Sequence, residues 1–328
     1  MVGPVIGAAN LQWAGYAPET VYGTAPALPA YFWPATGPVW GHPTDKYVDD
    51  ALRGSMAGEF QQVNGMRKGD TFTFTTYCYL DQVFVFLRQI LGLPDVLSGA
   101  SAPFTHKTSL QNGSNGQPVS ACIWWYDALG KCVQLPGAQM SDLKITINTA
   151  GLVTLVPTFV CLPGVFVTPP SQTPEAAQPM PGWKSIITLA GVPSTSFSEI
   201  IIDIKRATES VPAINGTQSP FAIFAGPLTI AGTIKAIYAG STDVHLVNEL
   251  NNNQPVLSVA LSAVGDAVNS LTMQFSRTAY DLADPVGTNK WMELSGTTKM
   301  LANTTDVAGG GNQSPMLVTL LSPVSTVI

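Results

Sequence analysis

The sequence predicts a mainly β protein that contains a duplicated β-rich domain, with one short α-helix in each copy. Three observations support this fold class. The apolar segments are mostly short and alternate with polar residues, and 30 glycines and 26 prolines interrupt the chain. A strand followed by a short helix occurs twice, about half a chain length apart. A chain of 328 residues is also long enough for two domains with a core each.

The first strand–helix unit lies between residues 70 and 92. Phe72 and Phe74 alternate with threonines, which is the period of a strand. Apolar residues then recur every three or four positions, as in a short amphipathic helix, with Asp81 as the N-cap and Gly92 as the stop. We expect the helix to pack on a sheet, because burying each apolar side chain contributes roughly 1.5–3 kcal/mol. The predicted packing residues are Val83, Phe84, Leu87, Ile90 and Leu91.

The second unit combines a predicted strand at residues 228–238 with a predicted helix at residues 243–250. Asp243 is the expected N-cap of this helix. The two caps, Asp81 and Asp243, are 162 residues apart (243 − 81), and half of the chain is 164. This spacing supports the duplication. The predicted packing residues of the second helix are Val244, Val247 and Leu250.

The remaining segments complete a four-part division of the chain. Residues 1–30 are rich in Gly, Ala and Pro and are interpreted as an N-terminal arm. Residues 31–162 form the first predicted domain, and residues 183–328 form the second, which ends in a C-terminal arm. Residues 163–182 contain six prolines, so we interpret them as an extended, semi-rigid linker.

Further strands are predicted on both sides of the linker. In the first domain, residues 119–126 and 131–135 read as a hairpin, and residues 141–147 and 152–160 read as a second pair. Pro157 indicates an edge position or a bulge. The strands predicted in the second domain are residues 184–190, 197–205, 256–262, 270–277 and 316–321.

Two longer segments interrupt this pattern at corresponding places. Residues 54–69 and residues 206–227 each precede the strand of a strand–helix unit, and both are rich in turn-forming residues. We interpret both as loop excursions from their domains.

The charge content indicates a subunit of an assembly. Only 11% of the residues are charged, against about 25% in a typical soluble domain. The sequence contains no apolar run of 18 residues, so no membrane span is predicted, and residues 1–18 lack the positive region of a secretory signal. We therefore expect much of the surface to be covered by other copies or partners. A net charge of −6 without a basic cluster argues against specific nucleic-acid binding.

The sequence shows no pattern of a chemical site. The three histidines (His42, His106 and His245) are far apart and lack neighbours at metal-ligand spacing. No phosphate-binding loop or nucleophile elbow is present, so we predict no enzyme, cofactor or metal. Cys122 and Cys132 flank the predicted hairpin and could face each other, but free core thiols are favoured.

Three short motifs, in the correct order, resemble a known family. They are Gly15–Thr24 (G-Y-x-x-E-T-x-Y-G-T), Ala51–Ser55 (A-L-R-G-S) and Met140–Asn148 (M-S-D-L-K-I-T-I-N). With the strand–helix unit between the last two, they resemble the major tail tube proteins of long-tailed, siphovirus-type bacteriophages. Residues 278–315 match no part of that pattern.

The resemblance implies a structural role in a virion. Members have β-sandwich domains with a flanking helix, and their rings stack into a hollow tube that conducts DNA to the host. The chain would then be two tandem β-sandwich tail tube domains, and trimeric, pseudo-hexameric rings are implied, with hexamers as the alternative. The implied partners are further copies, the tape measure protein, the tail terminator and the distal tail proteins. The implied location is the virion tail, assembled in the host cytoplasm.

By the same analogy, the two excursions would stack on the neighbouring ring. The candidate ring-stacking residues are Met56, Phe60, Val63, Met66, Arg67, Lys68, Ile214 and Phe221.

Two other classes stay open. One is a different injection tube or a virion coat protein built from β-sandwiches. The other is a secreted carbohydrate-binding module, in which Trp124 with Trp125, or Trp291, would stack on sugar rings.

Overall fold

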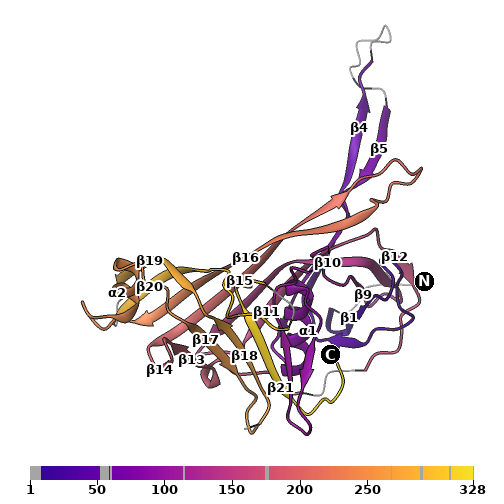
Figure 1. Cartoon of the computed structure of the whole chain (residues 1–328). Coiled ribbons are helices and arrows are strands. Elements are labelled where there is room, and N and C mark those ends of the chain that lie inside the picture. The colour runs from indigo at the N-terminus through magenta and orange to yellow at the C-terminus, as the bar shows by residue number, and fades with distance from the viewer. Residues whose placement is uncertain are drawn as a thin grey trace, which may run out of the picture.

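The computed structural model describes residues 9–51, 59, 61–113, 115–173, 177–266, 268–288, 291–309 and 312–327. These residues form antiparallel sheets and two α-helices, α1 (Leu80–Leu91) and α2 (Val244–Leu250) (Figure 1). The predicted mainly β fold with two short helices is confirmed.

The largest sheet, which we call the long sheet, runs through both halves of the chain. Its main path has the strand order β19–β20–β16–β15–β10–β11–β6–β3, so β10 of the first half pairs with β15 of the second. One face of these strands is buried and the other is partly exposed, which is the alternation of a sheet covered on one side. The strands are β3 (Thr36–Gly41), β6 (Asp70–Tyr77), β10 (Cys132–Asn148), β11 (Thr154–Cys161), β15 (Phe197–Val211), β16 (Ala222–Ile237), β19 (Thr278–Gly287) and β20 (Met292–Met300).

Further strands complete the fold. A seven-stranded sheet has the order β14–β13–β17–β18–β21–β8–β7, in which β21 of the second half pairs with β8 of the first. Strands β9 and β12 pair with the first part of β10, β1 pairs with β9, and β2 pairs with β1. Their bounds are β1 (Trp13–Pro18), β2 (Tyr31–Trp33), β7 (Val96–Ser98), β8 (Phe104–Thr108), β9 (Ala121–Tyr126), β12 (Val165–Val167), β13 (Ile186–Leu189), β14 (Val192–Ser194), β17 (Leu257–Leu261), β18 (Ser270–Phe275) and β21 (Leu317–Ser322), with short 3-10 helices at Ala9–Leu11 and Gly182–Lys184.

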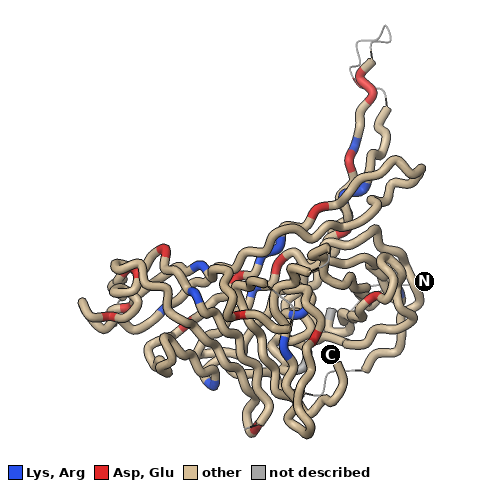
Figure 2. Tube along the Cα trace, viewed as in Figure 1, with Lys and Arg blue, Asp and Glu red and all other residues tan. Residues whose placement is uncertain are grey.

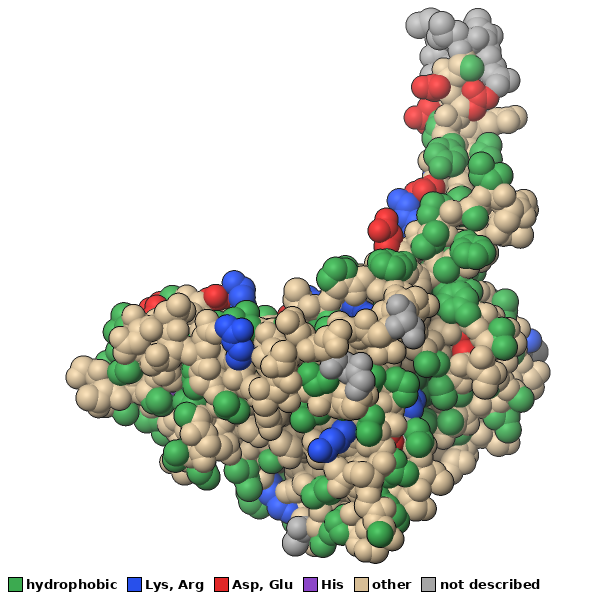
Figure 3. Space-filling model, in the orientation of Figure 1, with side chains coloured by type: hydrophobic (Ala, Val, Ile, Leu, Met, Phe, Trp, Pro, Cys, Tyr) green, Lys and Arg blue, Asp and Glu red, His purple; other side chains and the backbone are tan. Residues whose placement is uncertain are grey.

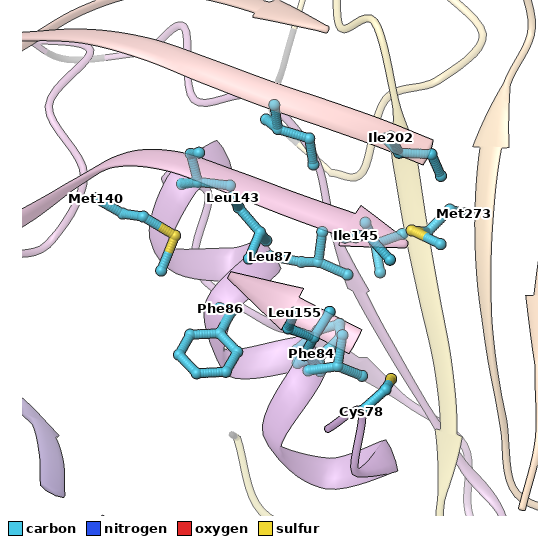
Figure 4. Close-up of a cluster of buried hydrophobic side chains, with 14 of the residues drawn as sticks. Cys78, Phe84, Phe86, Leu87, Met140, Leu143, Ile145, Leu155, Ile202 and Met273 are labelled. Carbon is cyan, nitrogen blue, oxygen red and sulfur yellow. The ribbon is translucent and has the colours of Figure 1, made fainter. Parts of the chain in front are cut away.

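Helix α1 is buried between these layers. It contacts β10 of the long sheet and β8, β18 and β21 of the seven-stranded sheet. Figure 4 shows Leu87 beside Leu143 and Ile145 of β10, and Phe84 beside Leu155 of β11. The helix ends at Gly92, whose φ of 89° is a left-handed conformation that glycine adopts without strain. The predicted packing residues Val83, Phe84, Leu87, Ile90 and Leu91 are all fully buried.

The start of α1 differs from the sequence prediction. The helix begins at Leu80, its N-cap position is Tyr79, and Asp81 lies inside the first turn. Backbone pairing fixes this entry, because the Cys78 N–H donates to the Val153 carbonyl (2.9 Å) and the Cys78 carbonyl accepts from Met180 (2.9 Å). The prediction of Asp81 as N-cap was wrong.

Helix α2 has the predicted cap but buries a different face. The Asp243 side chain accepts a hydrogen bond from the His245 N–H (2.9 Å). Val244 is 46% exposed and Leu250 is 71% exposed, and Val247 is half-buried, whereas His245 is buried. The prediction that Val244 and Leu250 pack on a sheet was therefore wrong. The helix packs on β19 through a polar contact, between His245 Nδ1 and the Tyr280 hydroxyl (2.9 Å), that an apolar stripe cannot predict.

In both predicted excursions, most of the described residues lie in strands. Residues 54–69 contain β5 (Gln61–Arg67), which pairs with β4 (Thr44–Asp49) in a two-stranded hairpin. Residues 206–227 are mostly the paired ends of β15 and β16, which continue past a bulge between Arg206 and Thr208. The β ladder continues through most of the described residues of each segment.

Three other segments differ from the simple division of the chain. Trp13–Pro18 is the buried strand β1 rather than part of an arm. Within residues 163–182, β12 pairs with β10, and Met180 is fully buried. Pro157 lies in the central strand β11, where the pairing with β6 is interrupted between the Leu155–Thr76 and Thr158–Thr73 pairs. An interrupted ladder tolerates the missing N–H of proline without an edge position.

Candidate functional site

The most prominent surface feature is an arm formed by β4 and β5, which projects from the body (Figure 1). Its base is fixed to the sheet by charge. Arg67 bonds Asp70 (2.5 Å) and Lys68 bonds Asp45 (2.8 Å). The buried Asp70 carboxylate also accepts from Trp40 Nε1 (2.9 Å). These contacts set the direction in which the arm leaves the long sheet.

The tip of the β15–β16 hairpin lies against the base of this arm. The Arg67 N–H donates to the Gln218 carbonyl (3.0 Å), and Gln218 Nε2 donates to the Gly65 carbonyl (3.1 Å). Next to the tip of the hairpin, the Ile223 N–H donates to the Tyr22 hydroxyl (2.6 Å). The two predicted excursions therefore form one projection, which we call the composite arm (residues 44–51, 59, 61–67 and 207–225).

The predicted stacking residues occupy different parts of the composite arm. Ile214 and Phe221 are exposed on the β15–β16 tip, and Val63 is exposed on β5. Met66 is half-buried, and Arg67 and Lys68 form the ion pairs at the base. Met56 and Phe60 lie outside the described residues. Figure 3 shows hydrophobic side chains along the projection, and Figure 2 shows its charges.

Arg206 connects the composite arm to α1, and sequence analysis missed it. Its guanidinium donates to the carbonyl oxygens of Ile90 (2.8 Å), Gly116 (2.8 Å) and Gly226 (3.1 Å). Burial lowers the pKa of Arg206 to about 10. The signal was available, because Arg206 follows Ile204 on the inward-facing positions of β15, where a charge is unexpected.

Glu19 lies in the first motif, and its side chain connects separate segments of the chain. Its carboxylate accepts hydrogen bonds from the Gly23 N–H (2.8 Å), the Ser120 hydroxyl (2.6 Å) and the Gly137 N–H (2.8 Å). The Gly15–Thr24 segment therefore ties three chain segments together near the foot of the composite arm, and it explains why a carboxylate is buried there.

Among the described residues, the main path of the long sheet ends in two strands that each have a partner on one side only. In its path, β3 pairs with β6 and β19 pairs with β20, and each is the last strand. The two ends come from opposite halves of the chain. Such edges present unpaired backbone groups and are templates for pairing with another chain.

The open face of the long sheet is rich in threonine and in paired charges. Its ion pairs join Lys205 to Asp203 (2.7 Å), Lys235 to Glu199 (3.0 Å) and Lys299 to Asp281 (2.8 Å). Burial, with the nearby Asp203, raises the pKa of the Asp142 carboxyl to about 6. The face therefore carries no strong field of one sign.

The described residues contain no group of three His, Cys, Asp or Glu side chains placed to hold a metal. His106 is enclosed with Asp95, with Nδ1 2.6 Å from Oδ2, and its Nε2 is 3.0 Å from the Val324 carbonyl oxygen. His245 bonds Tyr280, and His42 is exposed beside Trp40.

The cysteines are free and buried, which agrees with the favoured reading. The register places Cys132 opposite Tyr126 and Cys122 opposite Ala17, so the two thiols do not face each other across the hairpin. Trp124 is also buried, so it cannot stack on a sugar ring.

None of the helices in the described part of the chain is long and apolar enough to span a membrane. The projecting arm and the open ends of the long sheet's main path are features of a self-assembling structural subunit.

Comparison with known proteins agrees with this class. A family model described as phage tail tube protein matches residues 14–322. The chain therefore belongs to the phage tail tube protein family and is a structural component of a phage tail. The match includes residues 278–315, for which sequence analysis found no counterpart. No curated protein matches the chain.

Proposed function

We propose that this chain forms rings of three copies that stack into the hollow tail tube of a siphovirus-type phage, and that DNA passes through the tube during infection. The observation that carries the proposal is an internal repeat in strand pairing. In the first half the order along the long sheet is β10–β11–β6–β3, and in the second half it is β19–β20–β16–β15. In each half, the helix follows β6 or β16 directly along the chain.

The repeat supports two units per chain. In this correspondence β1 matches β13, because β1 pairs with β2 and β9 as β13 pairs with β14 and β17. The first unit therefore begins near Trp13 rather than at residue 31. We retain residues 163–182 as the connection and residues 183–328 as the second unit.

The repeat also indicates how chains join. Within the chain, β10 closes the first unit and pairs with β15, which opens the second. By correspondence, β19 closes the second unit and β3 opens the first, so β19 of one chain can pair with β3 of the next. Head-to-tail contacts of this kind close into rings or propagate as filaments. Three chains would supply six units and 24 strands (3 × 8), and both ends of the main path of the long sheet would be covered.

The open face of the long sheet is the proposed lumen surface, because α1 and the seven-stranded sheet occupy the other face. A net charge of −6 per chain gives −18 per ring (3 × −6). A threonine-rich wall with paired charges and a negative total does not bind phosphate tightly, and DNA can slide past it.

We assign ring stacking to the composite arm. Its exposed apolar residues, Val63, Ile214 and Phe221, lie on a projection where they add nothing to the core. We further propose contacts with a tape measure protein inside the tube and with terminator and distal tail proteins at its ends. Assembly in the host cytoplasm completes the proposal.

Removing the arm tests the stacking assignment. We expect a variant in which residues 46–66 are replaced by a short Gly/Ser turn to keep the ion pairs at the base and to melt normally, because loop length changes closure entropy by only about 0.6 kcal/mol per doubling. It should form free protomers or single rings in negative-stain images, while the unaltered protein forms tubes. Long tubes from the variant would exclude residues 46–66 as the stacking element, and an unaltered protein that forms closed shells would favour a coat protein.

A further inference from the structure

We infer that β19 of one chain pairs antiparallel with β3 of the next chain in a register that places Val286 opposite Val39, Pro285 opposite Trp40 and Asp284 opposite Gly41. This inference rests on the proposed ring and adds to it the residue-level structure of the contact between chains. We call that contact the seam, and we call the β10–β15 pairing its internal counterpart.

The correspondence between the halves begins at two bulges. The pairing of β10 with β11 shifts between Met140 and Asp142, and the pairing of β19 with β20 shifts between Tyr280 and Leu282. The bulges occupy the same place in the two strand pairs. Aligning them places each residue of β10 140 positions before its counterpart in β19 (282 − 142).

The neighbouring strands give a consistent alignment. Thr158 and Thr297 pair with the residues after the two bulges, so β11 and β20 are offset by 139 (297 − 158). Thr158 pairs with Thr73 and Thr297 pairs with Thr233, so β6 and β16 are offset by 160 (233 − 73). The pairs at the other end of these strands give the same offset (237 − 77).

The pairing of β6 and β16 with their other neighbours aligns β3 with β15, the two strands that open the units. Thr73 pairs with Val39, and its counterpart Thr233 pairs with Ile201. Val39 of β3 therefore corresponds to Ile201 of β15, an offset of 162 (201 − 39).

The seam register follows from the internal counterpart. There, Ile201 pairs with Thr146. Thr146 corresponds to Val286 through the offset of 140, and Ile201 corresponds to Val39. Val286 of one chain therefore lies opposite Val39 of the next, and the adjacent pairs follow from antiparallel geometry.

The seam and its internal counterpart pair different kinds of side chain. The difference suits a seam that forms after each chain has folded. The internal counterpart pairs Asp142 with Lys205 and Lys144 with Asp203. At the seam, the position of the second pair holds Asp284 and Gly41, which cannot form an ion pair. Instead the seam covers apolar side chains, since Val39 is 64% exposed and Val286 is 44% exposed in the single chain.

Paired cysteines test the register in the assembled protein. The variant Val39→Cys/Val286→Cys is oxidised after tube formation and run on a non-reducing gel. The internal control is Thr146→Cys/Ile201→Cys, which should form a bond within one chain. The slipped controls are Val39→Cys/Asp284→Cys and Val39→Cys/Thr288→Cys, which keep the same sheet face but shift the register by two residues.

The native thiols give little background. All four cysteines are buried. Burial raises the pKa of the Cys132 thiol to about 12 and also raises the pKa values of Cys122 and Cys161, so their reactive thiolates are scarce.

The expected result is conversion of the Val39/Val286 variant from single chains to covalent pairs and closed triplets, with no larger species, while the slipped controls stay single. A short bifunctional thiol reagent repeats the test where the angle of a direct disulfide is unfavourable. Cross-linking of a slipped variant, or none at Val39/Val286 in tubes whose internal control is bonded, would overturn the register and leave the ring standing. An unaltered protein that forms no rings or tubes would instead reject the proposed function.

Discussion

The two helices occupy corresponding places in the repeat, yet they differ in depth. Helix α1 has twelve residues and lies between two sheets, with Val83 to Leu87 almost entirely buried. Helix α2 has seven residues, packs on β19 and leaves Leu250 71% exposed. The difference arises because β21 of the second half pairs with β8 of the first, which extends the seven-stranded sheet across α1.

This comparison shows that the first helix organises the whole chain, whereas the second supports only its own unit. Through β8, β18 and β21, α1 contacts both halves, and Arg206 of the second half binds the carbonyls at its C-terminal end. Substitutions in corresponding helices should therefore have very different effects on stability.

The largest expected difference is between Leu87→Asp and Leu250→Asp. A carboxylate at the fully buried Leu87 position has no partner and should cost several kcal/mol, which leaves the protein insoluble. The same change at the exposed Leu250 should alter the free energy of unfolding by about 0.5 kcal/mol or less. Urea unfolding of each soluble variant provides the measurement. Equal effects would show that α2 is as central as α1.

A smaller effect is expected at the connection between the halves. Arg206→Met removes the hydrogen bonds to the Ile90, Gly116 and Gly226 carbonyls and should cost about 2–3 kcal/mol, because buried acceptors lose their donor. Arg277→Met is the matched control, since Arg277 is exposed and its guanidinium donates to the side-chain oxygen of Gln254. Thermal unfolding compares the two. An unchanged melting temperature for Arg206→Met would mean that Arg206 does not couple the halves.

The sequence predicted the strands and helices in which apolar residues recur at the period of that element, because burial of those residues sets the pattern. The alternation in β6 and the stripe of α1 identified both elements and their buried face. It failed where polar contacts decide the structure. In α2, His245 and Asn248 face inward because His245 bonds Tyr280, so the apolar residues do not mark the packed face.

The candidate site was predicted less completely than the fold. The sequence located both excursions, but the pairing of β4 with β5 and the contact of Gln218 with the arm depend on residues far apart in the chain. The pairing of β10 with β15, and with it the meaning of the open edges, likewise has no local signal. These pairings join residues that are far apart in the sequence, so a local residue pattern could not predict them.

The smallest expected effect is a dependence of the protein's stability on pH that arises from His245 in α2. Burial lowers the pKa of His245, although the nearby Asp243 opposes the shift, and the ring also contacts Tyr280. The unfolded chain therefore takes up this proton first, so the stability is fully present above pH of about 6.5 and decreases as the pH falls through the folded-state pKa. His245→Gln should flatten this part of the profile. Since His42 and His106 are present in both proteins, a profile that keeps its slope would assign the effect elsewhere.

The central claim is that one chain carries two ring-forming units, and the number of chains per ring tests it most directly. Rotational averaging of end-on tube views, with the native mass of single rings from the arm-replacement variant, gives that number. The account predicts three chains and six repeated sheet units around the lumen. A ring of six chains, with only one unit of each chain at the lumen, would contradict it.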